Sequence, residues 1–183
     1  MRLPWDKVFI FFGDERHVPP DDPESNYRMA NESLLSKASM PQQNVYRVLA
    51  ELDANEAAQK YEGQLRNFFN LHPNEFPRFD LIMLGLGPDG HTASLFPGSK
   101  ALDETNCLVV ANWVEKFQQY RITFTLPVLN HAAEIMFLVS GSDKSQILRE
   151  VLQTENTVYP AQRVTPDNGV LLWLVDQAAD GLA

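Results

Sequence analysis

The features that this sequence has little of give the first guide to its class. Its 183 residues include one cysteine, Cys107, so no internal disulfide framework can form and we expect a reducing, cytoplasmic location. No apolar run approaches the ~20 residues that a membrane-spanning helix needs, so we expect no membrane as a partner. Basic side chains are a minority, 15 against 24 acidic ones, and the formal charge is −9. That balance disfavours nucleic acid as a partner, because binding a phosphate backbone requires a basic face.

The rest of the composition is ordinary for a folded protein. Hydrophobic residues make up 44% and charged residues 21% of the chain, which argues against disorder, collagen and coiled coil. The length predicts a single domain over residues 1–183. An anionic ligand would have to be held by a local cluster of arginine and lysine, because the overall charge repels it.

Alternating strand and helix patterns predict an α/β fold with a mostly parallel sheet. Short apolar runs predict strands over 8–12, 79–84, 107–111, 122–126, 135–139 and 170–175. Helices are expected over 26–36, with Ser25 as the cap, and over 55–70 and 144–152. We expect the first two strands to be buried on both faces, and the proline-rich stretch 13–24 to be a loop.

Three polar loops follow predicted strands, and in parallel sheets such loops meet at one edge. They are GDER (13–16), GLGPDGH (85–91) and SGSDK (140–144). The second loop formally matches the dinucleotide fingerprint, but Asp89 would place a carboxylate beside the pyrophosphate and Pro97 would cut short the following helix. We therefore predict that the backbone N–H groups of the glycine loop 85–90 face a ligand oxyanion, with His91 at the edge of the loop.

Five motifs run in the same order as in a known family. They are FFGDERHVPPDDPESNYRMA (11–30), LGLGPDGHTASLFPGS (84–99), RITFTLPVLN (121–130), the Gly141-x-x-Lys144 turn, and PAQ…W (160–173). On these motifs the sequence resembles the 6-phosphogluconolactonases, within the wider group that includes the glucosamine-6-phosphate deaminases. The resemblance implies a three-layer α/β/α sandwich with a Rossmann-like sheet, and hydrolysis of the sugar-phosphate lactone 6-phospho-glucono-1,5-lactone in the oxidative pentose phosphate pathway. It implies no metal and no cofactor.

One departure from the family pattern leads to a further expectation. Family members carry a strand, a helix and a Ser/Gly-rich phosphate loop before the GDER strand, whereas this sequence begins almost at that strand. It has no SGGxTP-like segment. We therefore expect the chain to be truncated at its N-terminus and to lack part of its phosphate grip.

His91 is the predicted catalytic base, because lactone hydrolysis requires a group that takes a proton from water and imidazole titrates near neutral pH. The alternative is a structural histidine that caps a helix starting near Thr92. Asp89 would orient the imidazole or the water, and its alternative is a turn-forming residue before glycine. Gly87 is expected to contact the substrate.

Asp14 and Arg16 alternate along the chain, so in an extended backbone they point the same way. Arg16 would bind sugar hydroxyls or the phosphate, and Asp14 would hold His91 or a hydroxyl. Their alternative is an ion pair that pins the loop. Glu15 should face the opposite way in a structural role. Asn26 would contact the sugar or Arg16, or only cap a helix.

Two further cations are candidates for phosphate binding. Lys144 stands at the start of a helix, where anions are favoured, and its alternative is a solvated lysine. Arg121 matches the arginine of the family and would bind phosphate or support the scaffold. The remaining histidines have no metal-ligand spacing: His17, His72 and His131.

Two other functions compete with lactone hydrolysis. In the deaminases a glutamate after the motif histidine orients it, but the residue five positions after His91 is Phe96, which cannot hydrogen-bond an imidazole. A non-catalytic sugar-phosphate binder would have no chemical reason to keep His91 within an intact GHT. The sequence leaves a monomer and a weak homodimer open.

Overall fold

The structure is a computed structural model that describes residues 3–153 and 158–181. Its strands form three small sheets. β1 (Ile10–Phe11) pairs in parallel with β3 (Val45–Tyr46). β2 (Asp14–Arg16), β6 (Gln119–Phe124) and β5 (Val109–Val114) form an antiparallel sheet in that order. β4 (Ile82–Leu84), β7 (Glu134–Val139) and β8 (Val170–Val175) form a parallel one.

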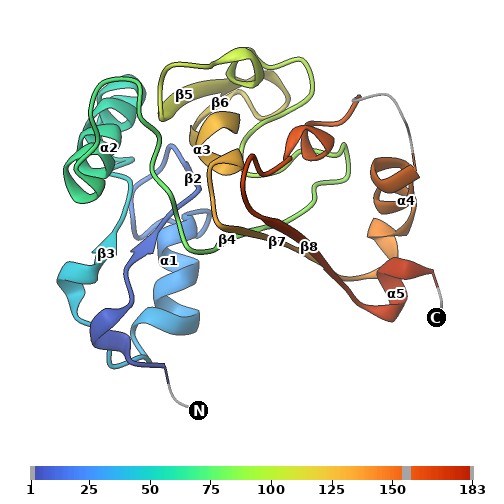
Figure 1. Cartoon of the computed structure of the whole chain (residues 1–183), viewed down its shortest axis with the longest axis horizontal. Coiled ribbons are helices and arrows are strands. Elements are labelled where there is room, and N and C mark those ends of the chain that lie inside the picture. The colour runs from blue at the N-terminus through green and yellow to red at the C-terminus, as the bar shows by residue number, and fades with distance from the viewer. Residues whose placement is uncertain (1–2, 154–157, 182–183) are drawn as a thin grey trace.

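The α-helices surround these sheets. They are α1 (Asn26–Ala30), α2 (Ala54–Phe69), α3 (Leu126–Asn130), α4 (Ser145–Gln153) and α5 (Gln177–Asp180). α2 lies at one end of the molecule and α4 and α5 lie at the other, with the β4–β7–β8 sheet between them (Figure 1). The predicted α/β class with parallel strands is therefore confirmed. Within the described residues, no helix is both long enough and apolar enough to cross a bilayer.

The expectation that 13–24 is a loop is wrong at its start. Asp14–Arg16 forms β2, because β6 offers it a free edge and an antiparallel ladder in which Asp14 faces Thr123 and Arg16 faces Arg121. The hairpin of β5 and β6 thus makes one sheet antiparallel, where a mostly parallel sheet was expected.

The helix predictions hold closely. The Ser25 side chain accepts a hydrogen bond from the Arg28 N–H at 3.2 Å, as an N-cap should, and the helix continues into a π-helical turn over Asn31–Leu35. α2 begins after Asp53, whose carboxylate accepts from the N–H groups of the first turn, and ends where Asn70 takes a left-handed conformation with φ 52°.

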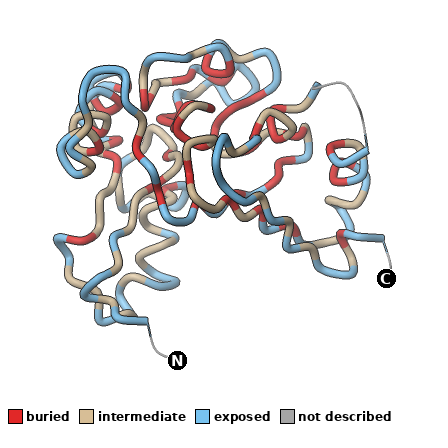
Figure 2. Tube along the Cα trace, viewed as in Figure 1, coloured by how far each residue is buried: buried red, intermediate tan, exposed pale blue. Residues whose placement is uncertain are grey.

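Burial on both faces was also predicted for two strands, and it is wrong for both. In 79–84 only Ile82–Leu84 is a strand, with Ile82 and Leu84 buried and Met83 63% exposed. In 8–12, Phe9 is 44% exposed and Phe12 is buried. The inner face of the β4–β7–β8 sheet packs into the core, where Phe137 stacks on Trp173 at 4.1 Å (buried segments are red in Figure 2).

The other face of this sheet carries exposed apolar side chains, although parallel sheets are ordinarily covered on both faces. The strand register places Met136 between Met83 and Leu172, and Leu138 beside Leu174. We call this surface the apolar face. Its large exposed members are Met83, Leu138, Val170, Leu172 and Leu174.

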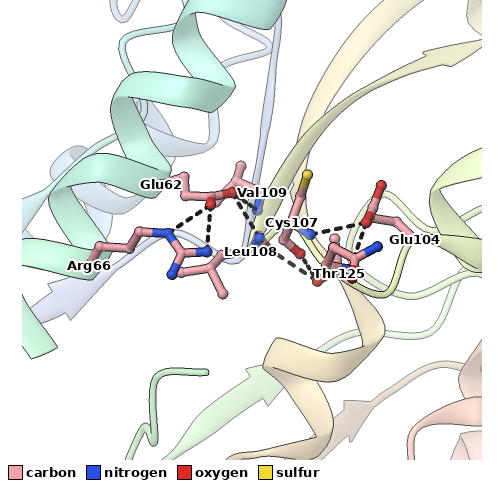
Figure 3. Close-up of polar contacts among 8 residues, drawn as sticks. Glu62, Arg66, Glu104, Cys107, Leu108, Val109 and Thr125 are labelled. Carbon is pink, nitrogen blue, oxygen red and sulfur yellow. Dashed lines mark hydrogen bonds and ion pairs between the residues drawn. The ribbon is translucent and has the colours of Figure 1, made fainter. Parts of the chain in front are cut away.

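Helix α2 is attached to β5 through one carboxylate (Figure 3). Glu62 Oε2 accepts hydrogen bonds from the backbone N–H groups of Leu108, at 2.8 Å, and Val109, at 3.3 Å. Its other oxygen pairs with the Arg66 guanidinium at 2.8 Å. The neighbouring Cys107 lies beside Glu62 and Glu104, and burial together with these charges raises the pKa of its thiol. Cys107 is therefore part of the support for β5 and not an activated nucleophile.

Tyr61 joins the same helix to β1. The Tyr61 ring is 1% exposed, and its hydroxyl accepts from the Phe12 N–H at 2.7 Å and lies 3.1 Å from the Phe12 carbonyl oxygen. Burial is the main reason that the pKa of this phenol is raised far above its ordinary value.

We predict that Tyr61→Phe lowers the free energy of unfolding by about 1–3 kcal/mol, because it leaves the buried Phe12 N–H without a partner. Urea unfolding followed by circular dichroism measures this loss. Tyr120→Phe, at an exposed tyrosine, is the control and should change stability by less than about 0.5 kcal/mol. Equal effects of the two substitutions would contradict the prediction.

Candidate active site

Two of the predicted loops leave the same edge of one sheet. β4 and β7 are parallel neighbours, so residues 85–91 after β4 and 140–144 after β7 emerge side by side. Thr92 Oγ1 donates to the Gly85 carbonyl at 2.9 Å and closes the base of the first loop. Thr92 and Leu95 then form an isolated bridge in place of a helix. The alternative that His91 caps a helix here is therefore wrong.

The glycine loop is closed on itself. Gly90, with φ 72°, donates its N–H to the Gly87 carbonyl at 3.0 Å, and the Gly87 N–H donates to the His91 carbonyl at 2.9 Å. The prediction that the loop turns its N–H groups towards an oxyanion is wrong for these two amides, because a tight turn consumes them. The Leu86 amide has no hydrogen-bond partner among the described residues, whereas the Asp89 amide interacts with its own carboxylate. Leu86 is therefore the amide that remains as a donor.

Gly87 has a steric role that the sequence alone did not indicate. A Cβ at this position would lie 2.0 Å from His91 Nδ1 and Cε1, whereas its φ is ordinary. The imidazole therefore occupies the space that a side chain at position 87 would fill.

His91 and Asp89 form a close pair. Nδ1 of His91 contacts Oδ1 of Asp89, and the His91 side chain keeps 23% of its surface exposed. Burial opposes the ionisation of Asp89, but the hydrogen bond and charge of His91 outweigh it and lower the pKa of the carboxyl. An ionised Asp89 accepts a hydrogen bond from Nδ1–H, which leaves Nε2 as the ring nitrogen available to a ligand or a water molecule.

Phe96 fixes the plane of this imidazole. Its buried ring stacks on His91 with the ring centroids 4.2 Å apart and the planes 29° apart. This is the position at which a deaminase would need a carboxylate, so among the described residues Asp89 is the hydrogen-bonding partner of the imidazole and Phe96 is its stacking partner.

The Asp14 carboxylate is hydrogen-bonded to two side chains. Its Oδ2 accepts from Ser94 Oγ at 2.7 Å, and its Oδ1 accepts from Asn26 Nδ2 at 3.2 Å. Among the described residues the imidazole is hydrogen-bonded to Asp89 and not to Asp14, so of the two roles expected for Asp14 the contact with a sugar hydroxyl stays a prediction. Asn26 contacts Asp14 and not Arg16, and its contact with the sugar also stays a prediction. Capping of α1 is performed by Ser25 and not by Asn26.

Glu15 has the structural role that was expected. It is 2% exposed and faces away from Asp14 and Arg16. Its carboxylate accepts hydrogen bonds from the N–H groups of Arg16, Asn26 and Tyr27 and from the Ser25 hydroxyl. It therefore ties β2 to the start of α1.

Arg16 and Arg121 stand opposite each other on β2 and β6. Arg16 Nη1 donates to the Glu24 carbonyl, and no ion pair with Asp14 forms among the described side chains, so that alternative is wrong. Arg121 is 9% exposed, and its Nε and Nη1 atoms find no hydrogen-bond partner in the part of the chain that is described. Burial and the charge of Arg16 lower the pKa of Arg121. Two adjacent guanidinium groups with unused donors form a potential anion site.

Lys144 ends a short helical turn, Ser142–Lys144, directly before α4, as predicted. Its Nζ lies 3.5 Å from Asp143 Oδ2 and its side chain is 24% exposed. No contact among the described residues joins it to His91, so a shared site for the two residues stays a prediction.

Sequence reasoning missed two residues of the β5–β6 turn. Lys116 Nζ lies 3.6 Å from Asp89 Oδ2, and Phe117 packs against Phe96. A hollow of about 370 Å³ beside them is lined by Asp89 and Phe96 together with Pro97, Gly98, Ser99, Trp113, Val114, Glu115 and Lys116. No local signal marks this turn, because its contacts span more than twenty residues.

An α/β fold with a carboxylate-oriented histidine after β4 and paired arginines on β2 and β6 is typical of an enzyme that handles anionic small molecules. Comparison with known proteins makes the class specific. The family model described as glucosamine-6-phosphate isomerases/6-phosphogluconolactonase matches residues 1–173. The chain belongs to this family.

The similar proteins support the lactonase side of that family. A 6-phosphogluconolactonase of Synechocystis is 43% identical over 180 residues, which are 97% of this chain and 74% of that protein. The solved structure of the Trypanosoma cruzi 6-phosphogluconolactonase aligns with a TM-score of 0.84 at 30% identity, over 95% of this chain and 72% of that one. The Thermotoga maritima 6-phosphogluconolactonase aligns with a TM-score of 0.81 at 32% identity, over 96% and 76%. The expected N-terminal truncation is not tested by these alignments and stays a prediction.

We predict that Gly87→Ala lowers kcat for the proposed lactone substrate by about 10²-fold or more, because the new Cβ displaces the imidazole and small misplacements of a catalytic group are costly. A spectrophotometric or pH-stat assay measures the rate, and circular dichroism checks the fold. Gly85→Ala is the matched control, since its Cβ would meet nothing within 4 Å. Loss of less than threefold in Gly87→Ala would show that the imidazole does not need its present place.

Proposed function

We propose that this chain is a 6-phosphogluconolactonase that hydrolyses 6-phospho-D-glucono-1,5-lactone to 6-phospho-D-gluconate in the oxidative pentose phosphate pathway. The observation that carries the mechanism is the Asp89–His91 pair, with Nδ1 on the carboxylate and Nε2 without a protein partner in the described structure. The family membership and the named relatives support the same reaction.

In the proposed mechanism, His91 Nε2 takes one proton from a water molecule as its oxygen attacks the lactone carbonyl carbon. A C–O bond forms, and the carbonyl oxygen becomes an oxyanion. The intermediate then collapses: the bond from C1 to the ring oxygen breaks, and the imidazolium returns its proton to that oxygen, now a hydroxyl. Asp89 stabilises the imidazolium while it carries the proton, which is why a lowered pKa at Asp89 is useful.

The remaining roles follow from the geometry. The Leu86 amide, within the glycine loop 85–90, is the proposed donor to the oxyanion. Gly87 is proposed to line the substrate site beside the imidazole that it accommodates. Asp14, held by Asn26 and Ser94, presents a fixed carboxylate to a sugar hydroxyl.

We propose that the cations bind the phosphate of the substrate. Arg16 and Arg121 offer unused guanidinium donors from neighbouring strands, and Lys144 adds a point charge at the next loop. Such a cluster is needed because the formal charge of the chain, −9, repels a phosphorylated ligand.

We propose that the reaction uses neither a metal nor a cofactor, since an activated ester requires only a base and an oxyanion site. We further propose a cytoplasmic protein whose residues 1–183 form one domain, as a monomer or weak homodimer without nucleic-acid or membrane partners.

The deaminase alternative fits the site poorly. Opening a sugar ring with a histidine calls for a second carboxylate beside it, and Phe96 occupies that place at 4.2 Å. A non-catalytic binder leaves the Asp89–His91 pair without a use. Assay with both the lactone and glucosamine 6-phosphate distinguishes the three functions directly.

We predict that His91→Ala lowers the enzymatic rate of lactone hydrolysis by ~10²–10⁴-fold, the usual cost of losing a general base. The measurement is proton release at fixed pH, with the spontaneous rate subtracted. His72→Ala, in the loop after α2, is the control and should keep the activity. A loss of less than fivefold in His91→Ala would identify a different base, and absence of activity in the unmodified chain would reject the proposed function.

We predict that Lys144→Ala raises KM by roughly tenfold and changes kcat by less than threefold, because it removes a charge-assisted contact to the phosphate that is equal in ground and transition states. Steady-state kinetics separates the two constants. Lys100→Ala is the control for a general loss of positive charge. A fall in kcat with unchanged KM would place Lys144 outside the phosphate site.

A further inference from the structure

Phe117 is a large apolar side chain in an unusual place. It ends the short turn Glu115–Phe117 between β5 and β6, which closes with Gln118 in a left-handed conformation. The ring is 46% exposed at the tip of a hairpin, where a polar residue would be better solvated. Packing in the core therefore does not explain why a phenylalanine stands at position 117.

The contacts of Phe117 lead to the two halves of the proposed site. The guanidinium carbon of Arg121 lies 5.2 Å from the centre of the Phe117 ring, within the range of a cation–π contact. On the other side, Phe117 meets Phe96 edge to face, with centroids 5.8 Å apart and an interplanar angle of 71°. Phe96 in turn stacks on His91. Phe117 thus contacts Arg121 directly and His91 indirectly, through Phe96.

Arg121 has little else to hold its head group. Its Nε and Nη1 atoms lack hydrogen-bond partners among residues 3–153 and 158–181, and no ion pair in those ranges includes it. Arg16 stands opposite on the neighbouring strand, and burial together with the charge of Arg16 lowers the pKa of Arg121. The carboxylates of Asp14, Glu15 and Glu24 attract the guanidinium electrostatically, but none of them forms an ion pair with it among the described residues. The Phe117 face is therefore the direct contact that holds the head group in place.

We propose that Phe117 is a positioning residue for lactone hydrolysis. Its ring holds the Arg121 guanidinium with its unused donors ready for the substrate anion, and it braces Phe96 beneath His91. The inference rests on the proposed function, in which Arg121 binds the phosphate. Lys116, the residue before Phe117, has its Nζ 3.6 Å from Asp89 Oδ2. The same turn therefore contacts both the proposed anion site and the Asp89–His91 pair.

The test separates the aromatic face from simple bulk. Phe117→Leu keeps an apolar side chain but removes the π-face, and Phe117→Tyr keeps both. We expect Phe117→Leu to raise KM for the lactone about tenfold with a smaller change in kcat, and Phe117→Tyr to stay within twofold of the unmodified chain. Phe9→Leu is the matched control, at a 44% exposed phenylalanine that packs on Phe68 far along the chain, and should leave both constants unchanged.

A readout without turnover accompanies the kinetics. Isothermal titration with 6-phosphogluconate should show weaker binding in Phe117→Leu by a similar factor, and the Arg121 Nε–H resonance should lose its ring-current shift. Equal KM and equal product affinity in the Leu and Tyr variants would overturn the proposal, as would a lowered melting temperature with both constants unchanged. If the unmodified chain hydrolysed no lactone but bound the product with the Leu/Tyr difference intact, the proposed function would fail and the positioning role would stand.

Discussion

The geometry of the candidate site depends on one steric condition, which is that Gly87 has no Cβ. His91 can turn back over its own loop and set Nδ1 against Asp89 only because position 87 carries no side chain. The same tight turn uses the Gly87 and Gly90 amides for its own closure and so decides which donors remain for an oxyanion. The proposed base, its orienting carboxylate and the proposed oxyanion donor therefore all depend on one backbone conformation of the seven residues 85–91.

The sequence predicted local secondary structure well and tertiary contacts poorly. Ser25 and α2 were predictable because caps and helical periodicity act within a few residues. β2 was missed because a three-residue strand has no periodicity, and only its ladder with β6 defines it. The assumption that a continuous apolar run is buried on both faces failed at Met83, where the sheet lacks a covering layer among the described residues.

The same division applies to the candidate site. His91 and Asp89 could be paired from their two-residue spacing, and Lys144 could be placed before α4 from its turn. The partners of Asp14 could not, because Ser94 lies eighty residues further along the chain. Phe117 gave no signal in the sequence, because its proposed role depends on a contact with Arg121, which the β2–β6 ladder places opposite Arg16.

The apolar face of the β4–β7–β8 sheet has a consequence for the colloidal behaviour of the chain. Methionine and leucine side chains lie open there, with Met83 63% and Leu174 51% exposed, on a molecule whose formal charge is −9. Mutual repulsion between like-charged molecules is then what keeps these patches apart, and it extends only about 8 Å at physiological ionic strength. Concentrated salt screens this repulsion, and acid that neutralises the carboxylates also weakens it, whereas neither changes the apolar face. Aggregation through that face should therefore begin well before the protein unfolds.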